Sequence, residues 1–127
     1  MLSAWVALGS AIGGVLRFWC SGAAARAFGE TFPWGTLLVN VTGSCLIGLF
    51  AILSGPDGRL LIGPTTRQMV LIGAFGGFTT FSSFSLQTLA LARDGEWGLA
   101  AANILGSVIL CLAGVWIGSV AGSLINR

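Results

Sequence analysis

The stretch GAFGGFTTFSSFS, residues 73–85, decides how this chain folds. It lies inside an apolar segment that is long enough to cross a membrane. Adjacent glycines followed by threonines and serines favour helix poorly, because glycine is costly in a helix and hydroxyl side chains compete for backbone hydrogen bonds. In a membrane, a broken helix is tolerated only where its freed backbone is buried in protein or lines a cavity. We predict a break here; a continuous helix with a glycine packing face is the alternative.

Three further apolar segments surround this stretch. A transmembrane helix needs about 20 predominantly apolar residues. We predict spans at about 2–25, 34–54, 67–92 and 97–124. The first span is interrupted only by Arg17, and the connectors are short and polar. We therefore expect residues 1–127 to form a single membrane domain.

The composition agrees with a lipid environment. Charged residues make up 8% of the chain and hydrophobic residues 55%, and the mean hydropathy is +0.93. A soluble domain carries roughly 25% charged residues. A scattered net charge of +2 gives no nucleic-acid footprint. Cys20, Cys45 and Cys111 lie in apolar stretches at no metal-ligand spacing, which indicates small packing residues. The class is an all-α integral membrane protein with lipid around it and no nucleic-acid partner.

The arginines leave the orientation in the membrane open. An even number of spans places both termini on one side, with Arg59, Arg67 and Arg127, and leaves Arg26 and Arg93 on the other. Orientation follows the excess of Lys and Arg on one side, and three against two is almost none. Two interpretations remain: one weakly marked orientation, or dual topology with an antiparallel dimer.

Glycines at intervals of four indicate how the helices meet. Gly9 and Gly13 form one such pair, and Gly114, Gly118 and Gly122 form a series. Small residues at this spacing let helix backbones approach closely. A bundle packed this tightly leaves little room for a pore, so a conduction path is expected to need a second subunit.

Polar residues inside the spans are the candidate site. Thr36, Asn40 and Ser44 share one face of the second span, because residues four apart lie on the same side of a helix. Membrane-buried polar groups serve either function or helix association. Asn40 is therefore a candidate pathway residue or interhelical glue.

The third and fourth spans carry further candidates. Phe81 and Phe84 lie three apart; they either pack against lipid or present their positive ring edges to a small anion. On the fourth span, Asn103, Ser107 and Cys111 recur every four residues and form a second polar stripe. Together these features suit an anion path without a fixed charge.

The ionisable residues exclude two other functions. Every carboxylate lies in a connector, and the chain contains no His or Lys. A proton-coupled pump needs a titratable group within the membrane. Arg17 cannot release its proton and suits an anion-attracting vestibule. No nucleophile–base pair, metal-ligand cluster or phosphate loop is present, so we do not expect an enzyme.

Three motifs, taken in order, resemble the bacterial Fluc (CrcB) fluoride-channel family. They are GGVLRF at 13–18, GTLLVN at 35–40 and GGFTTFSSFS at 76–85, and the likeness covers nearly the whole chain. The resemblance implies a fluoride-selective passive channel in the bacterial inner membrane. It would be a dual-topology antiparallel homodimer with two pores at its interface, relieving toxicity by releasing F⁻ from the cytoplasm.

The resemblance also assigns residues. A structural Na⁺ at the dimer centre would be held by the backbone carbonyls of Gly76 and Thr79. The remaining matches are to the ion pathway, apart from Arg17, which matches the family's first-span arginine and keeps the vestibule role expected above. The pathway residues are Asn40, Phe81, Phe84, Thr36, Thr80, Ser82, Asn103 and Ser107. Cys111 departs from the family, whose members often carry a hydroxyl there.

Two other functions compete with this interpretation. A small proton-coupled multidrug exporter is also a dimeric four-helix protein, but it relies on a membrane-embedded carboxylate, whereas Glu30 lies in a connector. A non-transporting scaffold subunit would explain the glycine faces but not Asn40 or a broken third span. Ion flux by the purified protein separates a channel from a scaffold.

Overall fold

The computed structural model describes residues 1–127, and all of its regular structure is helical. Four helical segments are long and apolar enough to cross a membrane. They are α1 (Leu2–Phe28), α2 (Trp34–Leu53), a third span over Pro64–Arg93, and α6 (Trp97–Asn126). The prediction of an all-α chain with four spanning helices is confirmed.

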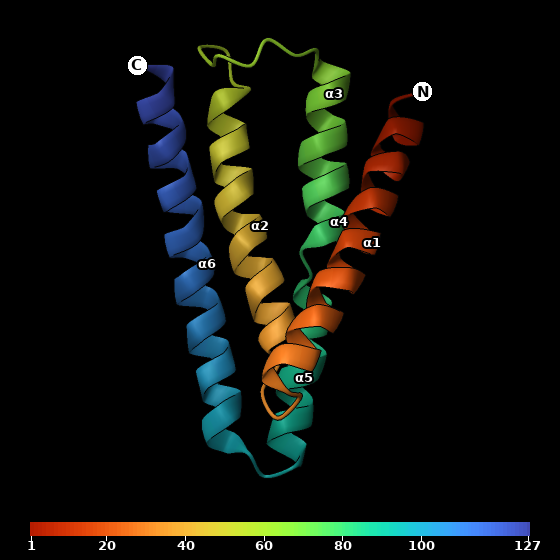
Figure 1. Cartoon of the computed structure of the whole chain (residues 1–127), viewed down its shortest axis with the longest axis vertical. Helices are drawn as coiled ribbons and strands as arrows, with labels where there is room; N and C mark the ends of the chain where they lie inside the picture. The colour runs from red at the N-terminus through yellow and green to blue at the C-terminus, as the bar shows by residue number, and fades with distance from the viewer.

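The third span is composite. It begins with α3 (Pro64–Gln68), continues through a π-helical segment, η1 (Met69–Phe75), and a single turn, α4 (Gly76–Phe78), and resumes as α5 (Phe81–Arg93). Thr79 and Thr80 separate the two halves in extended conformation, with φ and ψ of −85° and 160° and of −154° and 116°. The chain therefore breaks inside the stretch where glycines and hydroxyl residues predicted it (Figure 1).

Hydroxyl side chains stabilise both ends of the break. The Thr79 amide and hydroxyl both donate to the Phe75 carbonyl oxygen, at 3.0 and 2.9 Å. The Thr80 hydroxyl accepts from the Ser83 amide at 3.1 Å, which is an N-cap for α5. Threonine is a favoured N-cap because its oxygen satisfies an amide left free at a helix start. The residues that weaken a continuous helix thus also terminate its two halves.

Two helix pairs form the bundle, and glycines set their spacing. Figure 1 shows α1 beside the upper half of the third span and α2 beside α6. A Cβ on Gly13 would overlap the Ala74 carbonyl oxygen, and one on Gly118 would overlap the Cys45 carbonyl oxygen. Each pair therefore packs backbone against backbone, as small residues allow in membranes.

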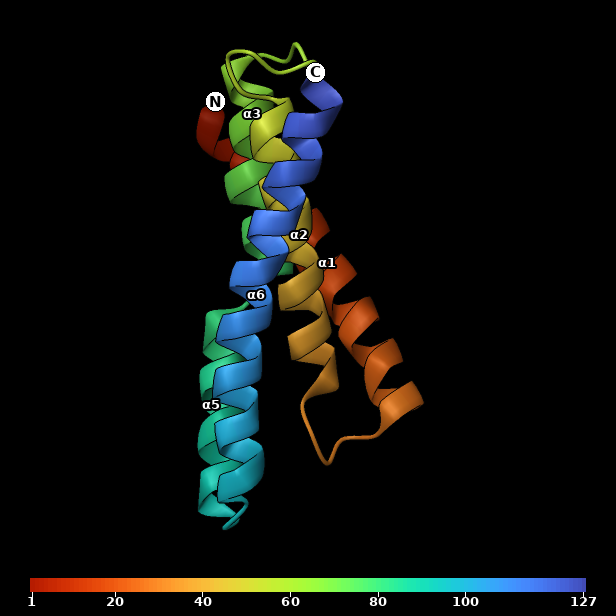
Figure 2. The same cartoon turned by 90° about the vertical axis from the view of Figure 1, so that its left-hand side faces the viewer.

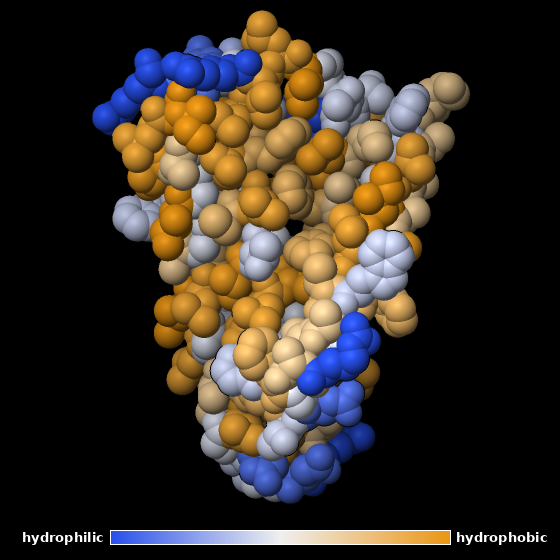
Figure 3. Space-filling view, in the orientation of Figure 1, coloured by the Kyte–Doolittle hydropathy of each residue, from blue (hydrophilic) through white to orange (hydrophobic).

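The chain has two different ends. Both termini and the α2–α3 connection lie at one end, as expected for an even number of spans (Figure 1). At the other end, α5 and α6 diverge from α1 and α2 (Figure 2). Hydrophilic residues gather mainly towards the two ends, with a broad apolar band between them (Figure 3). This is the surface of a multi-pass membrane protein.

The α2 C-terminus is tied to the rest of the terminal end. Arg67 donates from Nε to the Ser54 carbonyl and hydroxyl oxygens, both at 3.2 Å. Asn126 donates to the Ile52 carbonyl oxygen at 3.3 Å. Cationic and amide donors satisfy the carbonyls that a helix leaves free at its C-terminus. These contacts join α2, α3 and α6 at one end of the molecule.

Candidate functional site

The Asn40 side chain holds the backbone of the helix break. Its Nδ2 donates to the Thr80 carbonyl oxygen at 2.9 Å, and its Oδ1 accepts from the Thr80 amide at 2.7 Å. The extended conformation removes Thr80 from the helical hydrogen-bond pattern, and buried backbone groups are costly without a partner. Asn40 therefore supplies, from α2, both partners that the break takes away. The second N–H of Asn40 Nδ2 makes no hydrogen bond within the chain.

A first cavity, called the break cavity, lies beside this clamp and has a volume of about 360 Å³. Its wall is formed by α2, the break, α5 and α6. It brings together eight residues that the sequence singled out: Asn40, Ser44, Thr79, Thr80, Phe81, Phe84, Ser107 and Cys111. Amide, hydroxyl and aromatic groups from distant parts of the chain thus meet around one small space.

The two phenylalanines meet in this wall. The ring centroids of Phe81 and Phe84 are 5.2 Å apart, and the planes are inclined by 48°. Phe84 is 8% exposed, whereas Phe81 is 75% exposed within the single chain. A tilted arrangement keeps ring edges, where the positive potential lies, available to a neighbour. Phe84 is fixed by the fold, and Phe81 stands on a face that the chain itself leaves uncovered.

Asn103 lines neither cavity. It is 1% exposed, and its Nδ2 donates to the Thr88 hydroxyl at 2.9 Å, which ties α6 to α5. Its Oδ1 accepts from the Ser107 hydroxyl at 3.3 Å, and the Thr88 hydroxyl donates to the Phe84 carbonyl at 2.8 Å. Asn103 is therefore the centre of a buried chain of hydrogen bonds that runs from Ser107 to the backbone of Phe84.

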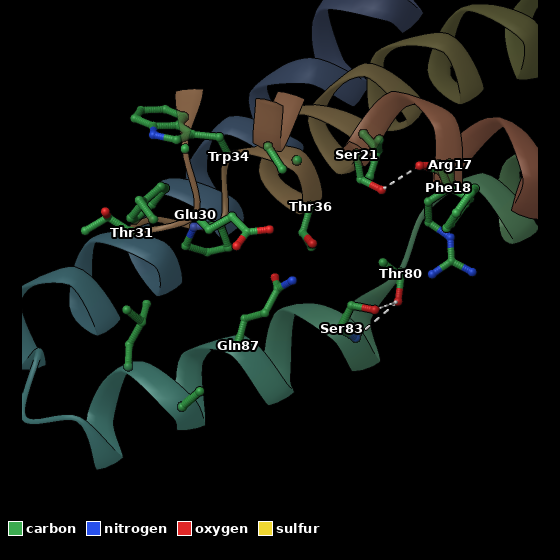
Figure 4. A pocket seen from close by; sticks show the side chains of 18 of the residues that line it. Arg17, Phe18, Ser21, Glu30, Thr31, Trp34, Thr36, Thr80, Ser83 and Gln87 are labelled. Carbon is green, nitrogen blue, oxygen red and sulfur yellow. Dashed lines mark hydrogen bonds between the residues drawn. The ribbon is translucent and has the colours of Figure 1, made fainter. Parts of the chain in front are cut away.

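A second cavity, called the outer cavity, opens at the end opposite the termini and has a volume of about 790 Å³ (Figure 4). It lies between α1, α2 and α5, and the α1–α2 and α5–α6 connections form its mouth. Arg17, Thr36, Thr80, Ser83 and Gln87 line it. Thr80 lines both cavities, so the helix break is the wall that they share.

The charges of the outer cavity are separated along its length. Arg17 lies beside the break, and its guanidinium points into the cavity near Thr80 (Figure 4). Glu30, Asp94 and Glu96 belong to the connections at the mouth. A cation at the closed end of a low-dielectric cleft attracts anions towards it. The structure therefore places Arg17, the predicted vestibule residue, at the inner end of the outer cavity.

The remaining predicted residues have different surroundings. Ser82 is exposed and lines neither cavity, although its hydroxyl lies 3.2 Å from that of Thr80. Thr79 lines the break cavity, and its carbonyl oxygen accepts no hydrogen bond within the chain. Gly76 is exposed, and a Cβ there would meet open space. A free carbonyl is a suitable ligand for an alkali cation.

Sequence reasoning missed Gln87. Its side chain reaches into the outer cavity from α5 towards α2 (Figure 4), and its Oε1 is buried without a hydrogen-bond partner. A signal was present, because Gln87 follows Phe81 and Phe84 at intervals of three and so continues their face of the helix. A buried carbonyl without a partner costs free energy, which sets Gln87 apart from the packed polar residues.

Comparison with known proteins identifies relatives of this chain. Residues 4–119 match the family model described as CrcB-like protein, Camphor Resistance (CrcB). The chain is 58% identical over 122 residues to a protein of Opitutus terrae, covering 96% of this chain and 92% of the relative. It is 59% identical over 124 residues to one of Paramagnetospirillum magneticum, covering 98% and 97%. Both relatives are named fluoride-specific ion channel FluC.

Proposed function

Since this chain belongs to the CrcB-like family, we propose that it is a fluoride-selective passive channel that releases F⁻ from the cytoplasm. The protein is a multi-pass protein of the bacterial inner membrane, and it is not an enzyme. The observation that carries the proposal is that Thr80 lines both cavities. An ion that enters the outer cavity thus reaches the break, and beyond the break lies the small space walled by Asn40 and the two phenylalanines.

The groups around the break can replace the water that fluoride loses. Fluoride is small and strongly hydrated, so a path for it needs good hydrogen-bond donors at close range. Asn40 retains one free N–H, and Phe81 and Phe84 offer ring edges. Removing a buried donor costs about 1–3 kcal/mol, which is enough to slow permeation severely. Exit remains fast as long as no single group binds the ion too tightly.

The cavities favour a passive path over a coupled exporter. No Asp, Glu, Lys or His lines the break cavity, and the carboxylates of the outer cavity lie in its connections rather than in its helices. Proton-coupled transport relies on a titratable group within the membrane. Without one, fluoride moves only down its gradient. Neutral HF that enters from an acidic medium dissociates inside, and the channel would let the trapped F⁻ leave.

A second copy in antiparallel orientation would complete the site. Phe81 stands 75% exposed although it faces the break cavity, and Gly76, at the other side of the break, is exposed as well. Burying them against a second chain would close the path on the side that this chain leaves open. The near balance of arginines at the two ends is compatible with both orientations in the membrane. We therefore infer a dual-topology homodimer with two pores at its interface.

A structural Na⁺ fits the break. The Thr79 carbonyl oxygen accepts no hydrogen bond, and Gly76 lies on the uncovered face. We infer that these two carbonyls, one pair from each copy, would hold the ion at the dimer centre. A bound Na⁺ would offset the partial negative charge of the freed carbonyls. It would thereby fix the shape of the break, to which Asn40 and Thr80 are attached.

Fluoride efflux from liposomes that contain only this purified protein tests the proposal. An ion-selective electrode follows release, a potassium ionophore balances charge, and chloride-loaded liposomes are the control. Fast fluoride release without chloride release, and without a pH gradient, is the expected result. Release that requires an imposed proton gradient would establish coupled exchange instead. A folded dimer that releases no fluoride under either condition would be a scaffold.

A further inference from the structure

Arg17 contacts the break as well as the outer cavity. Its Nε donates to the Gly77 carbonyl oxygen at 3.1 Å. In an unbroken helix this oxygen would accept from the amide four residues later, that of Phe81. The extended conformation of Thr79 and Thr80 removes that partner. Arg17 therefore gives the freed Gly77 carbonyl oxygen a hydrogen-bond donor, just as Asn40 gives one to the freed Thr80 carbonyl oxygen.

The packing of α1 places Arg17 within reach. A Cβ on Gly13 would lie 2.8 Å from the Phe78 amide nitrogen, and one on Gly77 would lie 2.5 Å from the Ser10 carbonyl oxygen. These close approaches hold the α1 backbone against α4. Arg17 follows Gly13 by one turn on the same face, so its side chain extends past the end of α4. Its position is thus set by the glycine contact and not by the cavity.

We propose that Arg17 is a positioning residue with two separable parts. The Nε–H fixes the free end of α4 and so keeps the break in its observed shape. The terminal amino groups are not used by that bond, and they supply the positive charge at the inner end of the outer cavity. The first part stands on the contact to Gly77 alone, and the second rests on the proposed function.

Two substitutions separate these parts because of the lengths of the side chains. Glutamine carries its amide nitrogen at the same number of bonds from the backbone as Nε of arginine. Arg17→Gln therefore keeps a donor for the Gly77 carbonyl and removes the charge. Lysine has a methylene at that position, so Arg17→Lys keeps the charge and loses the donor. Arg26 makes no side-chain hydrogen bond and does not line the outer cavity, so Arg26→Gln and Arg26→Lys are matched controls on the same helix.

Two measurements on the full-length dimer in liposomes test the proposal. Hydrogen exchange of the amides of residues 76–81 reports on the break, and fluoride efflux at low and high fluoride and at low and high ionic strength reports on the charge. Arg17→Lys should speed exchange about tenfold or more, because a charge-assisted bond is lost. Arg17→Gln should keep exchange near that of the parent. Its fluoride efflux should fall mainly at low fluoride concentration. The efflux of Arg17→Gln should also no longer depend on ionic strength.

Different results would contradict the two roles proposed for Arg17. Exchange in Arg17→Lys as slow as in the parent, or exchange in Arg17→Gln as fast as in Arg17→Lys, would overturn the positioning role. Efflux from Arg17→Gln that keeps the salt dependence of the parent would overturn the role of the charge. If the parent itself released no fluoride, the proposed function would fail, and the exchange rates would still decide whether Arg17 holds the break.

Discussion

Asn40 shows how one side chain can serve structure and permeation together. Its amide uses one oxygen and one N–H to hold Thr80, and the second N–H remains for an ion in the break cavity. From the sequence, interhelical glue and a pathway residue were alternatives. The structure gives the first role directly, and the cavity makes the second compatible with it, because an amide has more hydrogen-bonding capacity than Thr80 consumes.

Asn40→Asp tests whether the donors of Asn40 matter, because a carboxylate has neither N–H. The carboxylate can still accept from the Thr80 amide, but it has no donor for the Thr80 carbonyl, and when ionised it repels an anion. We expect a folded dimer whose fluoride efflux near neutral pH falls about tenfold or more, since losing a buried donor costs about 1–3 kcal/mol. The efflux assay above measures this. Ser123→Ala, which removes an exposed hydroxyl bonded only within α6, is the control. Parent-like efflux from Asn40→Asp would remove Asn40 from the pathway.

Gln87 and Asn103 mark the limit of sequence reasoning at this scale. Polar residues spaced four apart identify a helix face, but the spacing does not identify the neighbour that the face meets. Asn103 belongs to a regular stripe, yet it meets Thr88 of α5 and is sealed from both cavities. Gln87 follows Ser83 by four residues, and both residues line the outer cavity. Which partner a polar side chain meets is decided by helix packing, which the local pattern does not contain.

At the scale of elements, the break and the spans were the most predictable features. Hydropathy alone locates spans, because the membrane requires about 20 apolar residues in a row. The break followed from glycines and hydroxyl residues that both weaken a helix and cap its ends. The π-helical segment Met69–Phe75 was not predictable, because its sequence is ordinary for a helix. The contact between α1 and the third span was anticipated only as a glycine face, without its partner.

Gly13 and Gly14 offer a matched test of that contact. A Cβ on Gly13 would overlap the Ala74 backbone, whereas one on Gly14 would meet nothing within 4 Å. We expect Gly13→Ala to lower the free energy of unfolding by about 1–3 kcal/mol, the usual cost of overpacking. Gly14→Ala should leave it unchanged or raise it by up to about 1 kcal/mol, because alanine favours helix. Denaturation in detergent micelles, followed by circular dichroism, compares them. Equal destabilisation by both would show that α1 does not pack through Gly13.

For the whole molecule, the burial pattern is that of a chain with little apolar core of its own. Only 19 of 127 residues are buried, and the largest fully buried side chain is the polar Asn103. Large apolar side chains cover the outside, where lipid or a second copy must meet them. Membrane helices associate through close packing and hydrogen bonds rather than through a large apolar core. The sequence led to the expectation of a second subunit, but the exposure of Phe81, which such a subunit would cover, is visible only in three dimensions.

Surface labelling tests dual topology. Asp57 lies in the α2–α3 connection, at the end that carries both termini. We expect Asp57→Cys, in a chain whose native cysteines are replaced by alanine, to react with a membrane-impermeant maleimide on about half of the molecules in intact cells, because arginines at the two ends are nearly balanced. Lysed cells should label fully. Labelling of all or none of the molecules in intact cells would establish a single orientation.

The outer cavity opens at only one end of the chain, and in an antiparallel pair this has an electrical consequence. Each side of the membrane would then meet the entrance of a different copy, so the two approaches to the break would be encoded by one gene but built from separate molecules. A dimer of two identical chains would conduct equally in both directions, whatever residue occupies position 17. A dimer with a neutral residue at position 17 in one copy only would conduct fluoride unequally in the two directions.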